Sequence, residues 1–351
     1  MSPLQGIFVP IIAPYAADGK PSESAMRGIV EWLIGKGVSG LFPNGGMGEL
    51  IRLSHEERKH SLKIIADQSR GRVPVIAGAA EPDLGLVLDM CNCCADLGCR
   101  AVSITGPYYH KISQESMEHY FRQIAAKSPV DIIISHIPPF ANEISVPVMK
   151  RLAMDCPRIV GTMDAGKDLC RFLHVLNEIK PQRPEFSVLT GWDELLVPSL
   201  MMGGDGAAIP TAGVVPEAIM RIYQAARSED WPQAKRMQFK LLELFTAMLG
   251  GDHFPEGFRT GYELRGFSVG PARQILSPQE EAERKVIRER IACLLVEGGF
   301  SEAADECRQC PAPKPAFDGM PTSAPGGQTA DARPGYDIDA IVRSVMANIG
   351  R

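Results

Sequence analysis

Short apolar runs alternate with amphipathic stretches along most of the chain, from residue 6 to about residue 250. The runs are apolar at consecutive positions, which is typical of parallel strands that helices cover on both faces. Eight such runs predict eight βα units, and eight units that close on themselves form a TIM barrel. The predicted strands are residues 7–13, 38–42, 73–77, 101–105, 131–135, 158–162, 186–190 and 206–210.

Signals for the start of a helix lie between these runs. Ser54 precedes one amphipathic stretch and Glu57 stands three residues later, which is the spacing of a capping box. Ser113 opens another stretch, and residues 231–249 form a long amphipathic segment with a proline in its first turn. A charged helix is expected over 279–297. Residues 1–300 are therefore predicted to form an α/β domain, a (β/α)8 TIM barrel with additional C-terminal helices.

The composition changes after residue 300. Residues 301–335 are predicted to be a linker, because proline, glycine, serine and alanine leave too few apolar groups to offset the entropy of ordering. Residues 336–351 are predicted to form a short amphipathic helix that Asp337 caps. Such a short helix is only marginally stable unless it docks. Its apolar residues fall on one stripe: Ile338, Ile341, Val342, Val345 and Ile349.

Composition and charge exclude several classes of partner. The 351 residues carry a net charge of −5 without a basic run, so neither nucleic acid nor a membrane surface is expected as a partner. No window reaches the roughly 18 apolar residues of a membrane span, and the N-terminus lacks the pattern of a signal peptide. The cytoplasm is therefore the expected compartment. Nine cysteines, an odd number, fit reduced thiols. The lone pair Cys307 and Cys310 is too little for a zinc site, and no metal or cofactor is predicted.

Several motifs occur in order and at consistent spacing along the chain. They are Gly6-Ile7-Phe8-Val9-Pro10, Asn44-Gly45-Gly46-Met47-Gly48-Glu49, Val73-Pro74-Val75-Ile76-Ala77-Gly78, Pro107-Tyr108-Tyr109 and Gly191-Trp192-Asp193. Together they resemble the dihydrodipicolinate synthase / N-acetylneuraminate lyase family of class I aldolases. The resemblance covers residues 6–277 and implies a TIM barrel that assembles as a homotetramer. It also implies a small 2-oxo acid as ligand in the mouth of the barrel, held as a Schiff base on a lysine.

The departures from the family pattern fall on its chemistry. Met163 occupies the position of the Schiff-base lysine, and a thioether cannot form an imine. Gly46 and Met47 replace the two threonines that hold the substrate carboxylate. Ser135 stands where the family has its general acid/base tyrosine, and Phe140 falls where an arginine binds a carboxylate. Tyr109 is the retained member of the proton-relay set.

Candidate site residues follow from the resemblance and from polar groups at the ends of strands. Tyr109 and His136 are the predicted acid/base pair, since a histidine titrates near neutral pH. A metal-bound enolate held by His136 with Asp164 or Glu49 is an alternative, as is Lys167 as a substitute amine. The simpler interpretation makes Glu49 and Asp193 structural and Lys167 a surface residue. The predicted substrate-binding residues are Gly45, Gly46, Met47, Ser135, Met163, Asp164 and Ile209.

Two functional hypotheses remain open from the sequence. One is a lyase or hydratase that acts on a small carbonyl or oxo-acid compound without the lysine imine. The other is a non-catalytic barrel, a ligand sensor or scaffold. Residues 336–351 resemble the peptides that direct enzymes into the lumen of bacterial microcompartments, which predicts docking on a shell or cargo protein. The alternative is that this helix folds back onto its own barrel or a sister subunit.

Overall fold

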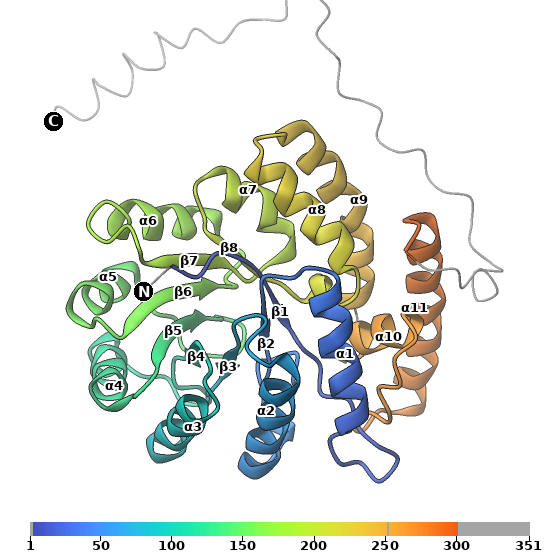
Figure 1. The fold of residues 1–351 in the computed structure, drawn as a ribbon, viewed down its shortest axis with the longest axis horizontal. Helices are drawn as coiled ribbons and strands as arrows, with labels where there is room; N and C mark the ends of the chain where they lie inside the picture. The colour runs from blue at the N-terminus through green and yellow to red at the C-terminus, as the bar shows by residue number, and fades with distance from the viewer. Residues whose placement is uncertain (1–2, 251–252, 301–351) are drawn as a thin grey trace, which may run out of the picture. The chain divides into compact units, whose positions relative to one another are not determined.

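A computed structural model describes residues 3–250 and 253–300. Eight parallel strands form one sheet in the order β2-β1-β8-β7-β6-β5-β4-β3. A parallel bridge between Leu41 and Val75 joins the two ends of this order, so the sheet closes on itself (Figure 1). The prediction of a TIM barrel is confirmed.

All eight predicted strands are present, and differences lie at their ends. The largest are three residues: β1 ends at Pro10 and not at residue 13, and β3 begins at Ile76 and not at residue 73, after Pro74. Proline lacks the N–H that a central strand donates to its neighbour, which accounts for the late start. The strands are β1 Gly6–Pro10, β2 Gly40–Phe42, β3 Ile76–Gly78, β4 Ala101–Thr105, β5 Asp131–His136, β6 Ile159–Asp164, β7 Ser187–Thr190 and β8 Gly206–Ala208.

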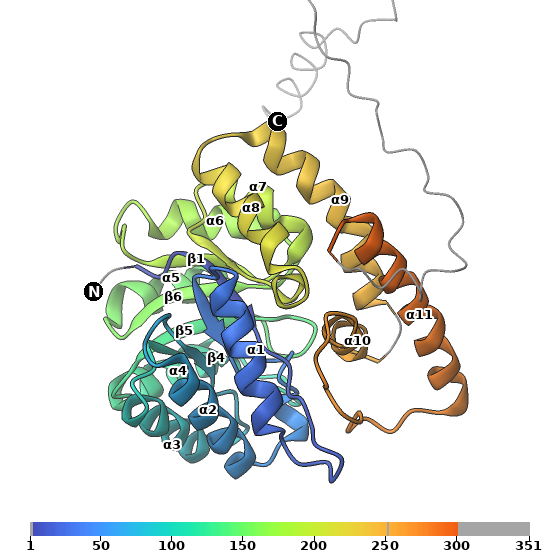
Figure 2. The same cartoon turned by 45° about the vertical axis from the view of Figure 1, so that its right-hand side comes forward.

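The helices cover the outside of the barrel, and three more follow the eighth βα unit. Ser54 and Glu57 form the predicted capping box at the start of α2. Figure 2 shows α11 beside α9 and α10, on the side of the barrel where α1 lies. The helices are α1 Glu23–Gly35, α2 His55–Ser69, α3 Leu84–Asp96, α4 Gln114–Lys127, α5 Val146–Asp155, α6 Leu169–Ile179, α7 Leu196–Met201, α8 Pro216–Arg227, α9 Trp231–Leu249, α10 Glu256–Leu264 and α11 Pro278–Glu297.

Side chains along each strand point alternately into the lumen and toward the helices, so the barrel has two separate apolar cores. One apolar cluster takes a residue from every strand, and only the lumen of the barrel brings all eight strands together. Residues at the intervening positions belong to a larger cluster between the barrel and its helices. The lumen cluster contains Leu4, Phe8, Phe42, Ile76, Ala101, Ile133, Met163, Leu189 and Ala208.

The tail predictions concern residues outside the described part of the chain. The linker 301–335, the helix 336–351 and the pair Cys307 and Cys310 all lie there. Within the described residues, none of the helices combines the length and the apolar character needed to cross a membrane.

Candidate functional site

Met163 lies in the lumen near the C-terminal end of β6. It is 5 % exposed and packs among the apolar residues of the lumen cluster. Gly191 leaves room for its sulfur, because a Cβ at residue 191 would lie 2.2 Å from Met163 Sδ. The centre of the site therefore holds a thioether. Lys167 is exposed and its ammonium sits 4.1 Å from the ring centroid of Trp192, as expected for a surface lysine.

Hydroxyl groups line the part of the lumen wall next to Met163, on β4 and β5. The side chains of Ser103 and Ser135 hydrogen-bond to each other, and both are buried. Alternation places them on the same side of the sheet as Ala101 and Ile133, which belong to the lumen cluster. Thr105, the register partner of Ser135, follows the same alternation. Ser135 therefore faces the lumen, and Ser103 and Thr105 are neighbours that sequence reasoning missed.

His136 and Asp164 point away from the lumen, which corrects the prediction that they line the ligand site. Each follows a lumen residue, Ser135 or Met163, by one position, so its side chain emerges on the helix side of the sheet. His136 Nδ1 accepts a hydrogen bond from the Ile144 N–H at 3.4 Å. Both side chains are almost fully buried there.

Burial shifts the pKa values of His136 and Asp164. Burial, reinforced by the nearby Arg171 guanidinium, lowers the pKa of His136 to about 3. Burial raises the pKa of Asp164, although the carboxylate accepts from the Gly166 N–H at 2.8 Å and from Arg171 Nε at 3.0 Å. His136 is therefore a neutral imidazole near pH 7, in contact with protein groups on the helix side of the sheet.

The loop after β2 presents backbone at the mouth of the barrel. Gly46 is exposed, whereas Gly45 is buried against Phe42. Met47 and, after β8, Ile209 are buried in the cluster between the barrel and its helices. Their side chains therefore do not face the lumen, which corrects their prediction as side-chain ligands. The exposed backbone N–H of Gly46 remains a hydrogen-bond donor for a carboxylate.

A buried ionic network fixes this loop. Glu49 adopts a left-handed conformation, with φ at 51°, and pairs with Arg52 at 3.1 Å and Arg259 at 3.4 Å. Arg259, on α10, is fully buried and also donates to the carbonyl oxygen of Ala13 at 2.6 Å. Glu49 is thus structural, as the simpler interpretation predicted. Arg259 was not anticipated from the sequence, because its partners in this loop and in the loop after β1, Glu49 and Ala13, are 210 and 246 residues away.

Asp193 is also structural. The carboxylate is buried after β7 and accepts from the backbone N–H of Thr211 at 3.1 Å. Burial raises its pKa to about 7. Among the described residues, no three histidine, cysteine or acidic side chains gather as a metal site would require. The metal alternative built from His136, Asp164 and Glu49 therefore has no supporting geometry.

Tyr109 projects from the surface of its own barrel. The side chain is 93 % exposed, and the backbone is held at φ 75°, in the left-handed region that costs a residue with a Cβ about 1–3 kcal/mol. Its ring contacts the edge of His110 at 4.9 Å between centroids. It therefore does not share a lumen with Met163 of the same chain.

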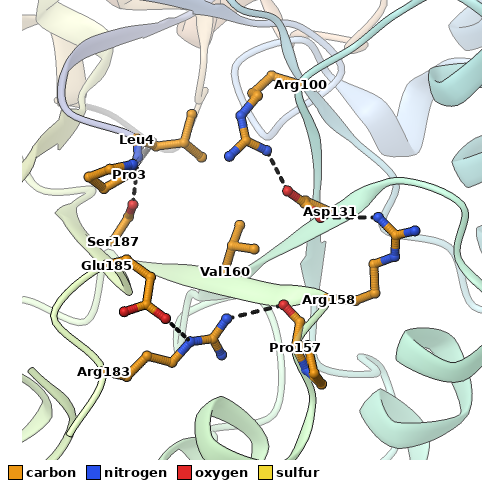
Figure 3. Close-up of a pocket in the computed structure, with 10 residues that line it drawn as sticks. All are labelled: Pro3, Leu4, Arg100, Asp131, Pro157, Arg158, Val160, Arg183, Glu185 and Ser187. Carbon is orange, nitrogen blue, oxygen red and sulfur yellow. Dashed lines mark hydrogen bonds and ion pairs between the residues drawn. The ribbon is translucent and has the colours of Figure 1, made fainter. Parts of the chain in front are cut away.

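A cavity of about 290 Å³ lies at the opposite end of the barrel, where the strands begin. Figure 3 shows Arg100 and Arg158 directed at the carboxylate of Asp131, with ion pairs of 2.6 and 3.3 Å. Arg183 pairs with Glu185 at 3.1 Å and donates to the carbonyl oxygen of Pro157 at 3.1 Å. In TIM barrels the active site lies at the other, C-terminal end, so this end contributes to stability.

Comparisons with known proteins agree with this architecture. The model of the dihydrodipicolinate synthetase family matches residues 3–293. An uncharacterized DapA-like lyase of Thermococcus kodakarensis is 30 % identical over 84 % of this chain and 99 % of its own length. A 4-hydroxy-tetrahydrodipicolinate synthase of Methanopyrus kandleri is 32 % identical over the same shares.

Solved structures show the same relationship. YagE, a prophage protein of E. coli K12 crystallised with pyruvate, superposes with a TM-score of 0.79 at 25 % identity, covering 85 % of this chain and 99 % of its own. A 2-keto 3-deoxygluconate aldolase of Picrophilus torridus gives 0.72 at 27 % identity, over 77 % and 97 %. The chain belongs to the dihydrodipicolinate synthetase family.

Proposed function

We propose that this protein is a lyase or hydratase that binds a small carbonyl or oxo-acid compound in the mouth of its barrel and acts without forming an imine. The observation that carries this proposal is the buried thioether of Met163 in the lumen. A thioether is a poor nucleophile toward a carbonyl, so a covalent route through residue 163 is closed.

Hydrogen bonding supports the non-covalent route. The hydroxyls of Ser103, Ser135 and Thr105 are donors on the lumen side of β4 and β5, where they would polarise a carbonyl oxygen. The exposed backbone of Gly46 would take part in holding a carboxylate. YagE binds pyruvate in a barrel of the same fold, and a 2-oxo acid has both of these groups.

The proton transfer is proposed to come from Tyr109 of a second copy. Tyr109 is 93 % exposed on its own barrel, so its side chain can project into a neighbouring barrel. The proposal requires a homo-oligomer, for which the family resemblance implies a tetramer. A homo-oligomer also explains why the large ring of Tyr109 lies at the surface of its own barrel.

A second candidate is a non-catalytic barrel that binds its ligand as a sensor or scaffold. It is favoured by the outward orientation of His136, which leaves the lumen with hydroxyls and a thioether near its centre. Hydroxyls donate hydrogen bonds well but are weak bases at neutral pH. The two candidates differ in whether a bound 2-oxo acid loses a proton.

Borohydride trapping tests the proposed mechanism. The full chain is incubated with pyruvate and borohydride, and its intact mass is measured beside the variants Met163→Lys and Lys167→Ala. We expect no adduct on the wild type or Lys167→Ala, and an adduct on Met163→Lys, because lysine reaches about as far as methionine. An adduct on the wild type that Lys167→Ala abolishes would overturn the proposal. Deuterium uptake at C3 of pyruvate then separates the candidates, since only an enzyme catalyses it.

The assembly is proposed to have two parts. The barrel forms the homo-oligomer, and residues 336–351 dock on a shell or cargo protein, which would place the enzyme in a bacterial microcompartment. We expect light scattering to give the same oligomeric state for the full chain and for a variant that ends at residue 300. A reporter fused to residues 301–351 should collect with a co-expressed shell. A reporter that stays diffuse would contradict docking by residues 336–351. A barrel that is monomeric in solution would contradict the homo-oligomer.

A further inference from the structure

Two aromatic rings converge at the C-terminal end of the barrel. Phe140, in the turn after β5, is 65 % exposed, and its ring centroid lies 6.1 Å from that of Phe254 with the planes 32° apart. Phe254 precedes α10 and contacts the buried ring of Phe258 in an edge-to-face arrangement at 6.1 Å. One ring is thus anchored in the core, and the other is exposed beside it.

Both rings lie at the mouth of the lumen. A Cβ added to Gly46 would lie 3.9 Å from Cε1 of Phe254, so this ring stands over the exposed glycine after β2. The backbone N–H of Phe140 donates to the carbonyl oxygen of Ile137 at 3.0 Å, and Ile137 packs against the lumen cluster. The turn therefore holds Phe140 at the rim above the site.

The chemistry of this rim differs from that of the lumen wall below it. Hydroxyls of Ser103 and Ser135 lie deeper, on β4 and β5, whereas the rim presents two rings without polar atoms. Covering an aromatic ring removes apolar surface from water, which favours binding. A ligand with a polar end and a flat apolar end would meet both surfaces at once.

We propose that Phe140 and Phe254 select the ligand, and that the ligand is an oxo acid with an aromatic or other flat apolar group at its distal end. The oxo-acid end binds at the hydroxyls of the lumen, and the apolar end stacks on the two rings. This inference rests on the proposed function, because it takes the same lumen as the ligand site. It adds the class of substituent that the rim accepts.

Isothermal titration of the full chain with phenylpyruvate and with pyruvate tests the inference. We expect phenylpyruvate to bind about tenfold tighter or more, because its phenyl group would be buried on the two rings and stack against them. Phe140→Ala should remove most of this preference, and Phe254→Leu, which keeps an apolar group on the core, should reduce it. Phe239→Ala removes an exposed ring on α9 that is 61 % exposed and should leave the preference unchanged.

The possible results distinguish a failure of the aromatic rim from a failure of the proposed oxo-acid site. Equal affinity for the two ligands in the wild type, or a preference that survives both rim substitutions, overturns the role of the rings and leaves the proposed function standing. Absence of binding by either ligand overturns the proposed oxo-acid site, and this inference with it. Loss of the preference in Phe239→Ala would show that the rings act through general stability.

Discussion

Replacing Arg259 with methionine is expected to lower the free energy of unfolding by about 3–5 kcal/mol. The guanidinium is fully buried and bonds the carbonyl oxygens of Ala13, Val269, Gly270 and Pro271 at 2.6–3.1 Å. It also pairs with Glu49 at 3.4 Å and Glu256 at 3.1 Å. Methionine fills a similar volume but leaves buried carboxylates and carbonyls without their donor, and that desolvation is the main cost.

Urea denaturation of the full chain measures the effect. Arg151→Met is the matched control, because Arg151 is 51 % exposed and its pair with Glu118 should contribute less than about 1 kcal/mol. Arg259→Lys should also be strongly destabilised, since an ammonium cannot reproduce the fork of a guanidinium. If the free energy of unfolding falls no more in both Arg259 variants than in Arg151→Met, the network does not fix the mouth of the barrel.

Lowering the pH from 7 to 5 is expected to cost about 2 kcal/mol of stability through His136. The unfolded chain protonates this histidine near the ordinary histidine pKa of 6.5, while the folded chain keeps it neutral until about pH 3. The unfolded state therefore binds more protons in this window, and stability falls as the pH falls. Asp164 acts in the opposite direction, because its raised pKa makes its contribution decline as the pH rises.

The comparison with His136→Gln isolates this effect. Glutamine keeps an acceptor for the Ile144 N–H but does not titrate, and Asp164 is present in both proteins. Between pH 7 and 5, the free energy of unfolding of the variant should therefore fall by about 2 kcal/mol less than that of the wild type. In NMR spectra of the wild type, the His136 ring should not titrate between pH 5 and 8. Parallel stability curves would show that His136 is solvated and available for proton transfer.

The fold could be predicted because its signals are local. Each strand is a short apolar run, and the capping box of Ser54 and Glu57 needs only adjacent sequence. The start of β3 differs from its prediction because Pro74 interrupts an apolar run that otherwise has the pattern of a strand. Such errors move a boundary without changing the architecture.

The site was harder to predict because side-chain direction depends on register. His136 and Ser135 are adjacent in sequence, but one residue decides which face of the sheet a side chain joins. Ser135 and Met163 are register partners that face the lumen, and their role in binding a ligand stays a prediction. Arg259 and Phe254 were missed, because part of their contacts, to Ala13 and Glu49 and to Phe140, come from segments more than 100 residues away.

The lumen cluster also sets the route by which a ligand moves. Leu4, Phe8, Phe42 and Ile133 fill the barrel between the mouth and the cavity at the other end, and TIM-barrel interiors are packed cores rather than pores. A ligand that enters at the mouth of the barrel must therefore also leave there. Under the proposed function, product and the next ligand would share this one opening, so product has to leave before another ligand binds.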